Sequence, residues 1–401
     1  MPATTAERIR KHKGPAVLGL GFRPFFLAGA VWAVVAMLAW LLVLAGALNL
    51  PTGFGAVDWH VHELLYGYLP AVVAGFLLTA VPNWTGRLPV TGLPLLAIVL
   101  IWAVGRAAVT IGLWLGPWLT AFLDLAFLAC LIAIIARELL AGANKRNLPV
   151  LLLVGLLFLG NATFHLEAAR FGSADYGTRL GIAAILLLLM LIGGRVVPSF
   201  TRNWLAQGKK SEKEAGRLPA PMSLFDGFAI AFAGLALLSF VATPWSPTTA
   251  VLALLAGLLH LARLARWAGD RTLKEPLVTI LHVGYAFVPT GFLLLAASHF
   301  SAAVQPIAAL HAWTVGGIGV MTLAVMTRAS LGHSGRALTA GATTSVIYVL
   351  IILSALARIL DGTAWGFDGL RALAGTLWIL AFTTFVVTYW PMLTRPRRRP
   401  G

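Results

Sequence analysis

The stretch from Pro24 to Leu48, PFFLAGAVWAVVAMLAWLLVLAGAL, decides the fold class, because it contains no charged residue. An α-helix needs about 20 apolar residues to cross the hydrocarbon core of a bilayer. Similar stretches recur along the 401-residue chain, which is 59% hydrophobic and 11% charged. We therefore predict an all-α polytopic membrane protein with about twelve transmembrane helices in a lipid bilayer. The predicted spans are residues 24–48, 62–81, 92–113, 118–138, 148–166, 179–198, 224–242, 248–268, 276–298, 304–326, 340–359 and 369–391.

The formal charge of +16 would suggest nucleic acid as a partner in a soluble protein. Here the basic residues fall mainly in alternate loops, which is the positive-inside pattern of membrane proteins, and no nucleic acid is expected. This pattern places both termini in the cytoplasm. The basic residues that carry it are Arg8, Arg10, Lys11, Lys13, Lys145, Arg146, Lys209, Lys210, Lys213, Arg217, Arg271, Lys274, Arg395 and Arg397 to Arg399.

The chain is predicted to form a single integral membrane domain, residues 1–401, with 202–221 as a cytoplasmic loop between spans six and seven. Related strings end spans two, six and ten: AVPNWT at 80–85, VVPSFT at 196–201 and AVMTR at 324–328. This spacing is compatible with three four-helix repeats, as in the main subunits of haem-copper oxidases. Chance similarity between apolar helices is the alternative.

Cys130 is the only cysteine of the chain. An internal disulfide, a cysteine-ligated iron–sulfur cluster and a CxxCH haem attachment are therefore excluded. Any metal must be held by histidine, carboxylate or methionine.

Several histidines lie near the predicted outer ends of spans. His60, His62 and Glu63 begin span two and His165 ends span five, whereas His311 lies roughly 10 Å inside span ten at about 1.5 Å per residue. Polar groups inside a bilayer usually mark function, so these imidazoles are candidate metal ligands, and Glu63 is a candidate catalytic carboxylate. If their turn is helical, His60 and His62 point to different sides and cannot share one ion. Hydrogen bonding to water or lipid headgroups is the alternative for His60.

The other histidines form a second pair and three isolated positions. His260 and His282 lie at similar depths in neighbouring spans and are candidates for a bis-imidazole site. Hydrogen bonds to backbone or to Tyr285 would explain them equally well. The three isolated residues are expected at an interface or in solvent: His12, His299 and His333.

Arginines within or close to the apolar segments must be paired, reach the interface or bind an anionic ligand. Arg106 and Arg358 are therefore candidate cofactor-binding residues, with Arg195 as a further example. Haem propionates would satisfy them, and so would a carboxylate such as Asp124.

Five separated strings together resemble the NnrS family: GFRPFFL at 21–27, WHVHE at 59–63, GFLLTAVPNWTG at 75–86, HAWTVGGIG at 311–319 and MTRASLGHSGR at 326–336. The resemblance covers most of the chain. It implies a bacterial inner-membrane protein that contains haem, of the non-covalent b type, and copper, and that takes part in the response to nitric oxide. It assigns no ligand residue by residue.

The resemblance does not settle the reaction. Our leading hypothesis is removal of nitric oxide, most concretely by reducing two molecules to nitrous oxide with two electrons and two protons. Quinol is a candidate electron donor, and Glu63 or another outer carboxylate would relay protons. Two alternatives remain at this point, a non-enzymatic protein that binds nitric oxide or metal, and a proton-coupled transporter. The sequence leaves the oligomeric state open.

Overall fold

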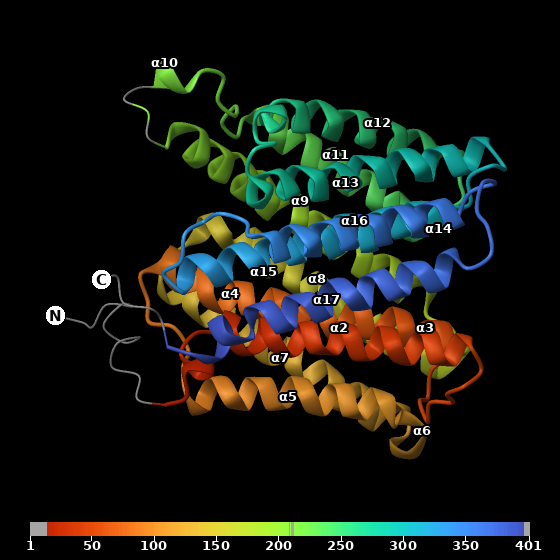
Figure 1. The fold of residues 1–401 in the computed structure, drawn as a ribbon. Helices are drawn as coiled ribbons and strands as arrows, with labels where there is room; N and C mark the ends of the chain where they lie inside the picture. Colours follow the sequence, from red (N-terminus) through yellow and green to blue (C-terminus); the bar gives the residue numbers. More distant parts are fainter. Residues whose placement is uncertain (1–13, 208, 210–211, 397–401) are drawn as a thin grey trace. The chain divides into compact units, whose positions relative to one another are not determined.

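The computed structural model describes residues 14–207, 209 and 212–396, so His12 lies outside the described residues. Within that part of the chain every regular element is a helix, and β structure is limited to a bridge between Val304 and Thr363 (Figure 1). Twelve helical segments are long and apolar enough to span a membrane. The all-α membrane fold predicted from the sequence is confirmed.

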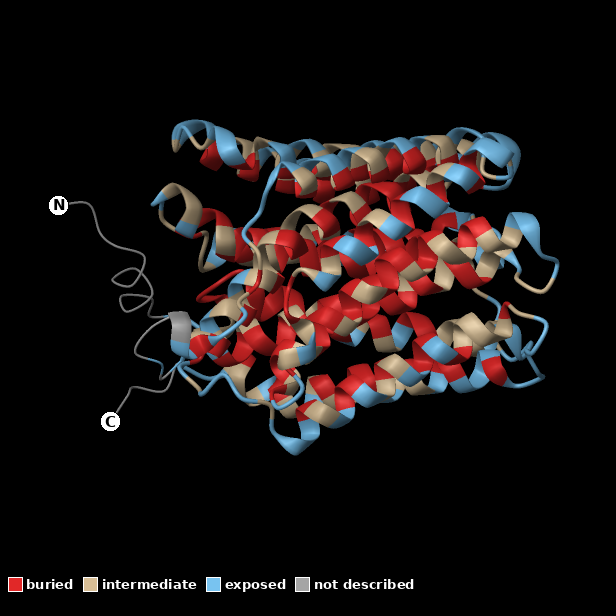
Figure 2. Ribbon diagram, turned by 90° about the horizontal axis from the view of Figure 1, so that it is seen from above, coloured by how far each residue is buried: buried red, intermediate tan, exposed pale blue. Residues whose placement is uncertain are grey.

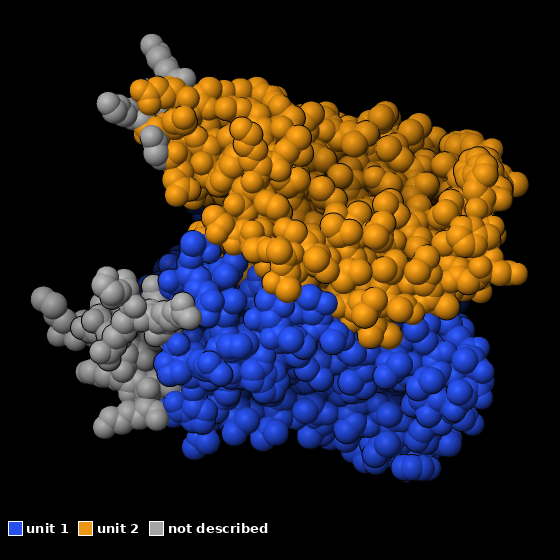
Figure 3. All heavy atoms as spheres, in the orientation of Figure 1, with its two compact units in different colours: residues 1–184, 329–337, 382–401 blue, residues 185–328, 338–381 orange. Residues whose placement is uncertain are grey.

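The chain divides into two compact units (Figure 3). Unit 1 comprises residues 1–184, 329–337 and 382–401, and unit 2 comprises residues 185–328 and 338–381. The helices of unit 1 are η1 (Ala16–Leu18), α2 (Phe22–Leu44), α3 (Ala56–His62), η2 (Glu63–Tyr68), α4 (Leu69–Thr85), α5 (Leu93–Thr110), α6 (Gly112–Leu115), α7 (Pro117–Ala141), η3 (Lys145–Asn147), α8 (Leu148–Phe171) and the first part of α9 (Asp175–Ala206).

Unit 2 contains the remainder of α9 and the helices that follow it, except for residues 329–333 and 382–394, which belong to unit 1. These are α10 (Glu212–Ala215), α11 (Leu224–Ala242), α12 (Pro247–Ala265), η4 (Gly269–Arg271), α13 (Pro276–Phe300), α14 (Pro306–His311), η5 (Ala312–Gly319), α15 (Val320–His333), α16 (Ala342–Asp361) and α17 (Leu370–Thr394). Within this unit α13 packs against α12, α14 and η5, and α16 packs against α14 and η5.

Proline and glycine set many of the helix limits. Proline occupies the first turn of α5, α7, α8, α12, α13 and α14, where no intrahelical donor is lost. Gly86 and Gly172 end α4 and α8 in the left-handed conformation, at φ of 69° and 76°, which glycine adopts without strain. Pro198 does not end its span as predicted, since α9 continues through it to Ala206.

Burial differs strongly between the spans (Figure 2). In the most apolar window of Ala56–Thr85, 83% of the residues are buried, against 28% for Phe22–Leu44. In a bilayer the exposed apolar faces of the outer helices contact lipid without cost. Ala56–Thr85 is therefore an inner span, where polar side chains meet protein rather than lipid.

Candidate metal centre

A change of helix type lies near the start of the inner span of unit 1, Ala56–Thr85. His62 is the last residue of α3, and Glu63 is the first residue of the π-helical segment η2. A π-helix bonds residue i to i+5 instead of i+4, and such segments occur frequently at functional sites. Both side chains are fully buried. The span thus carries an imidazole and a carboxylate into the interior of unit 1.

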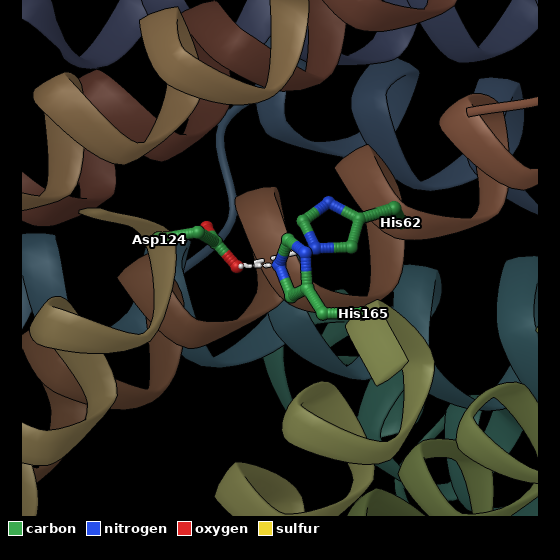
Figure 4. A group of neighbouring side chains, drawn as sticks. All are labelled: His62, Asp124 and His165. Atoms are coloured by element: carbon green, nitrogen blue, oxygen red, sulfur yellow. Dashed lines mark hydrogen bonds and ion pairs between the residues drawn. The ribbon is translucent and has the colours of Figure 1, made fainter. Parts of the chain in front are cut away.

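Three potential metal ligands from three helices converge at this point (Figure 4). Oδ2 of Asp124, on α7, lies 3.2 Å from Nε2 of His62 and 3.0 Å from Nε2 of His165, on α8. One ligand atom from each residue lies within 4.8 Å of the other two. All three residues are buried. Two imidazole nitrogens and one carboxylate oxygen form a donor set that suits transition metals.

Further hydrogen bonds hold the Asp124 carboxylate in place. Nδ2 of Asn161 donates to its Oδ2 at 2.7 Å, and Nη2 of Arg106 forms an ion pair with its Oδ1. Asn161 precedes His165 by one helical turn on α8, so the two side chains reach the same carboxylate from one face. The orientation of Asp124 is thereby set by groups that surround the three ligand atoms.

Glu63 orients His62 from the other side. Its Oε1 lies 3.1 Å from Nδ1 of His62 and accepts from Nη1 of Arg106 at 2.7 Å. Its Oε2 accepts from Nε1 of Trp32 at 2.6 Å. A carboxylate on Nδ1 is the usual support of a metal-binding histidine. The other nitrogen, Nε2, faces Oδ2 of Asp124 at 3.2 Å and Oδ1 of Asn161 at 3.0 Å.

The fixed charges of the cluster do not balance. Glu63 and Asp124 are opposed by Arg106, and all three side chains are at most 4% exposed. His62 contacts both carboxylates and opposes them only when its imidazole is protonated. With a neutral His62 the cluster holds one uncompensated negative charge, which is costly when buried. A bound cation would neutralise it, so both the charge and the donor atoms fit a metal ion.

Aromatic side chains enclose the imidazoles. The ring of Phe54 lies 5.2 Å from that of His62 and 5.3 Å from that of His165, and Phe164 packs edge-on against His62 at 5.1 Å. Tyr66 covers His62 at 5.5 Å and donates through its hydroxyl to the carbonyl of Gly177. Such a lining keeps water away from the three ligand atoms and strengthens electrostatic interactions among them.

The structure brings together four of the residues that the sequence singled out, namely His62, Glu63, Arg106 and His165. His60 lies in the same helical turn as His62 but stacks on Trp40, with ring centroids 4.5 Å apart. Because residues 56–62 are helical, His60 and His62 point to different sides, as the spacing required. Ligation by His60 stays a prediction, and it would have to involve a different site.

Sequence reasoning missed Asn161 and Trp32 and mentioned Asp124 only as a partner for an arginine. Asn161 carried a signal, since a polar residue four positions before His165 in an apolar span shares its helix face. The sequence gives no such signal for Trp32, because tryptophan is common in membrane spans. The convergence of Asp124 with His62 and His165 depends on packing between helices.

The two histidines of the second predicted pair have separate partners in unit 2. His260 contacts the hydroxyl of Tyr285 through Nδ1 at 2.8 Å and donates from Nε2 to the carbonyl of Ala229 at 3.2 Å. His282 contacts Oγ1 of Thr201 through Nε2 at 2.8 Å. The two contacts of His260 are hydrogen bonds to Tyr285 and to the backbone, which is the alternative to metal binding that the sequence left open. Metal binding by this pair stays an untested prediction.

A substitution at Gly67 tests whether the cluster is as tightly packed as it looks. A Cβ atom there would lie 2.5 Å from Nη1 of Arg106 and 2.8 Å from Oε2 of Glu63. We expect Gly67→Ala to lower the free energy of unfolding by about 1–3 kcal/mol, because the charged groups must move apart. The detergent-purified protein is heated, and the rate of thiol labelling of Cys130 reports its unfolding.

Gly155→Ala is the matched control for Gly67→Ala. Gly155 lies in α8, and a Cβ atom added there meets nothing within 4 Å. Alanine is the better helix former by about 1 kcal/mol, so this variant should unfold at the same temperature or higher. Equal unfolding temperatures for the two variants would contradict the packing described around Gly67.

Comparison with known proteins adds one finding. The family model described as NnrS protein matches residues 16–397 of the chain. No curated protein matches it.

Proposed function

The chain belongs to the NnrS family, and we propose that it is a metal-dependent inner-membrane enzyme that reduces nitric oxide to nitrous oxide. Membership supports a role in the nitric oxide response, and the family is known for metal or haem binding. The buried His62, Asp124 and His165 cluster carries the proposal. It presents two imidazole nitrogens and a carboxylate oxygen, beside a second buried carboxylate that shares the same arginine, inside a membrane protein, where such a group is expensive unless it is used.

We assign copper to this cluster, with Nε2 of His62, Nε2 of His165 and Oδ2 of Asp124 as ligands. The donor set suits copper and ferrous iron alike, and copper is the metal that the sequence resemblance implies. When bound, the metal would supply electrons and a coordination position for nitric oxide. His62, His165 and Asp124 would hold the metal with three ligand atoms, and a small molecule such as nitric oxide could then bind to it.

The surrounding residues position the ligands and exclude water. Glu63 holds the imidazole of His62 by its Nδ1, and Arg106 joins Glu63 to Asp124, so one guanidinium aligns both carboxylates. Phe54 and Phe164 line the cluster. Nitric oxide is small and apolar, so it reaches such a site through the bilayer, and the buried Glu63 carboxylate is the group we propose to relay the protons.

The overall reaction is balanced by two electrons and two protons: two molecules of nitric oxide give one of nitrous oxide and one of water. We propose that quinol supplies the electrons, because it is the reductant that dissolves in the same membrane. The alternating basic loops support an orientation with both termini in the cytoplasm.

The test is nitrous oxide formation by the purified protein in lipid vesicles with a reduced quinol. We expect many turnovers per protein for the wild type and a loss of at least about a hundredfold for His165→Ala, which lacks a ligand. His299→Ala, which changes an exposed histidine of α13, is the control and should retain activity. Uptake of nitric oxide without nitrous oxide would identify a binding protein and overturn the proposal.

A further inference from the structure

The two oxygens of the buried Glu63 carboxylate have different partners. Nε1 of Trp32, on α2, donates to Oε2 at 2.6 Å, a short distance of the kind found in hydrogen bonds to charged groups. Oε1 accepts from Nη1 of Arg106 at 2.7 Å and lies 3.1 Å from Nδ1 of His62. The indole thus holds one oxygen, and the other oxygen serves the arginine and the imidazole.

This division keeps Arg106 from taking the whole carboxylate. A guanidinium pairs best with a carboxylate through two parallel hydrogen bonds, one to each oxygen. Without the indole, Oε2 of Glu63 would be a buried charged oxygen that lacks a donor, which is costly. The last torsion of a glutamate side chain is soft, so the carboxylate would turn toward the guanidinium. That turn would draw Oε1 away from Nδ1 of His62.

Gly67 leaves the space in which these polar groups meet. It lies in η2, four positions after Glu63. A Cβ atom at Gly67 would lie 2.5 Å from Nη1 of Arg106, 2.8 Å from Oε2 of Glu63 and 3.1 Å from Nε1 of Trp32. The arginine, the carboxylate and the indole therefore surround one point of the π segment.

Helix α2 lies close to the inner span at Trp32. Gly29 and Ala36, three positions before and four positions after Trp32, share its side of the helix and are buried. A Cβ atom at Gly29 would lie 3.3 Å from Cβ of Ala71 on α4, which is tighter than ordinary contact. Because α2 packs against both η2 and α4, the indole is presented to Glu63 from a fixed helix.

Two other tryptophans of unit 1 have different partners for their indole nitrogens. Nε1 of Trp102, on α5, donates to the carbonyl of Gly67 at 2.9 Å, and its ring lies edge-on to that of Trp32 at 6.4 Å between centroids. Nε1 of Trp59 is buried and has no hydrogen-bond partner in the part of the chain that the structure describes. Of these three indoles, that of Trp32 is the one that donates to a charged group.

His311 shows how a histidine beside a π segment is held without a carboxylate. It is the last residue of α14, and η5 begins at Ala312. Its Nδ1 donates to the backbone carbonyl of Ile307 at 2.8 Å. A helical carbonyl is fixed by the backbone itself. Glu63 lies at the end of a flexible side chain, so it needs a second contact to hold His62 equally well.

We propose that Trp32 is a positioning residue of the metal centre in unit 1: its indole keeps the Glu63 carboxylate on Nδ1 of His62 and thereby orients the imidazole that binds the metal. Groups that orient a ligand in this way affect both metal affinity and the electronic structure of the bound metal. The inference rests on the proposed function, because the metal is the one assigned there to His62, Asp124 and His165.

The experiment titrates the full-length, metal-free protein with copper at buffered free concentrations and records the electron paramagnetic resonance of the copper(II) form. We expect Trp32→Phe to weaken copper affinity about tenfold, because the support of one ligand is lost. The hyperfine couplings of the copper and of its nitrogen ligands should change as well. If Trp32→Phe does not fold, benzothienylalanine at position 32, with sulfur in place of the N–H and nearly the same shape, should give the same loss.

Trp102→Phe is the matched control. It removes the same indole from the same region, but its hydrogen bond goes to a backbone carbonyl. Copper affinity and the resonance spectrum should therefore equal those of the wild type. An equal loss of affinity in Trp32→Phe and Trp102→Phe would show that general packing is the cause, and it would overturn the inference.

A double-variant cycle tests whether Trp32 acts through Glu63. We expect Glu63→Ala to weaken copper affinity, and adding Trp32→Phe to this variant should have no further effect. A further tenfold loss in the double variant would show that the indole acts independently of the carboxylate. That result would also overturn the inference.

The nitrogen NMR signal of Nδ1 of His62 in the metal-free protein separates this inference from the proposed function. We expect the signal, assigned with a His62→Gln variant, to move in Trp32→Phe and to stay in place in Trp102→Phe. An unchanged signal and unchanged copper affinity in Trp32→Phe would overturn the inference and leave the metal centre standing. A wild type that binds no copper, but whose signal moves in Trp32→Phe, would contradict the metal centre and leave the positioning role standing.

Discussion

Replacing Arg106 with glutamine is expected to lower the free energy of unfolding by about 3–5 kcal/mol, the cost of breaking a buried ion pair from one side. The substitution leaves the Glu63 and Asp124 carboxylates buried without the arginine that they share. A loss of this size corresponds to a fall in unfolding temperature of about 4–6 °C. Thiol labelling of Cys130 during heating of the detergent-solubilised protein measures it.

Two further variants decide whether charge is the cause. Arg137→Gln removes an arginine that is 66% exposed and paired with Glu138, and it should change the unfolding temperature little. Combining Arg106→Gln with Glu63→Gln removes one of the stranded carboxylates, so it should recover part of the loss. An Arg106→Gln protein as stable as the wild type would contradict the charge balance described for the cluster.

Asp124→Asn is expected to reduce the metal affinity of unit 1 by more than about a hundredfold. The amide has nearly the shape of the carboxylate but no charge, so the site loses an anionic oxygen ligand and its net negative charge. Arg106 keeps its partner Glu63, so folding should suffer less than in Arg106→Gln. Titration of the apoprotein with copper at buffered free concentrations measures the affinity.

The matched control is Asp270→Asn, which neutralises an exposed aspartate paired with Arg217. It should bind metal like the wild type. Full copper occupancy of Asp124→Asn at the same free concentration would show that the carboxylate is not a ligand.

The twelve spans could be predicted because hydropathy is a local property of the chain. The first and last residues of the spans were harder to predict. Span two starts at Ala56 instead of residue 62, and α9 continues through Pro198 to Ala206. In α9 the bilayer and the neighbouring helices stabilise a helix that local sequence signals would have ended. The π segments were not predicted at all, because composition does not distinguish them from α-helix.

The candidate site was predictable in its residue types and depth but not in its contacts. His62 and His165 attracted attention because imidazole is rare in apolar segments. That Arg106 joins Glu63 to Asp124 depends on the packing of three helices far apart in sequence. The pairing of Arg358 with Asp361 is different, because three positions along one helix bring the two together.

The central claim is that His62, Asp124 and His165 hold a transition metal. The most direct measurement counts copper and iron per chain in the wild type, in the double variant His62→Gln and His165→Gln, and in His299→Ala. We predict one copper per chain in the wild type and in His299→Ala, and none in the double variant, with haem iron unchanged throughout. A double variant that retains the copper of the wild type would contradict the account.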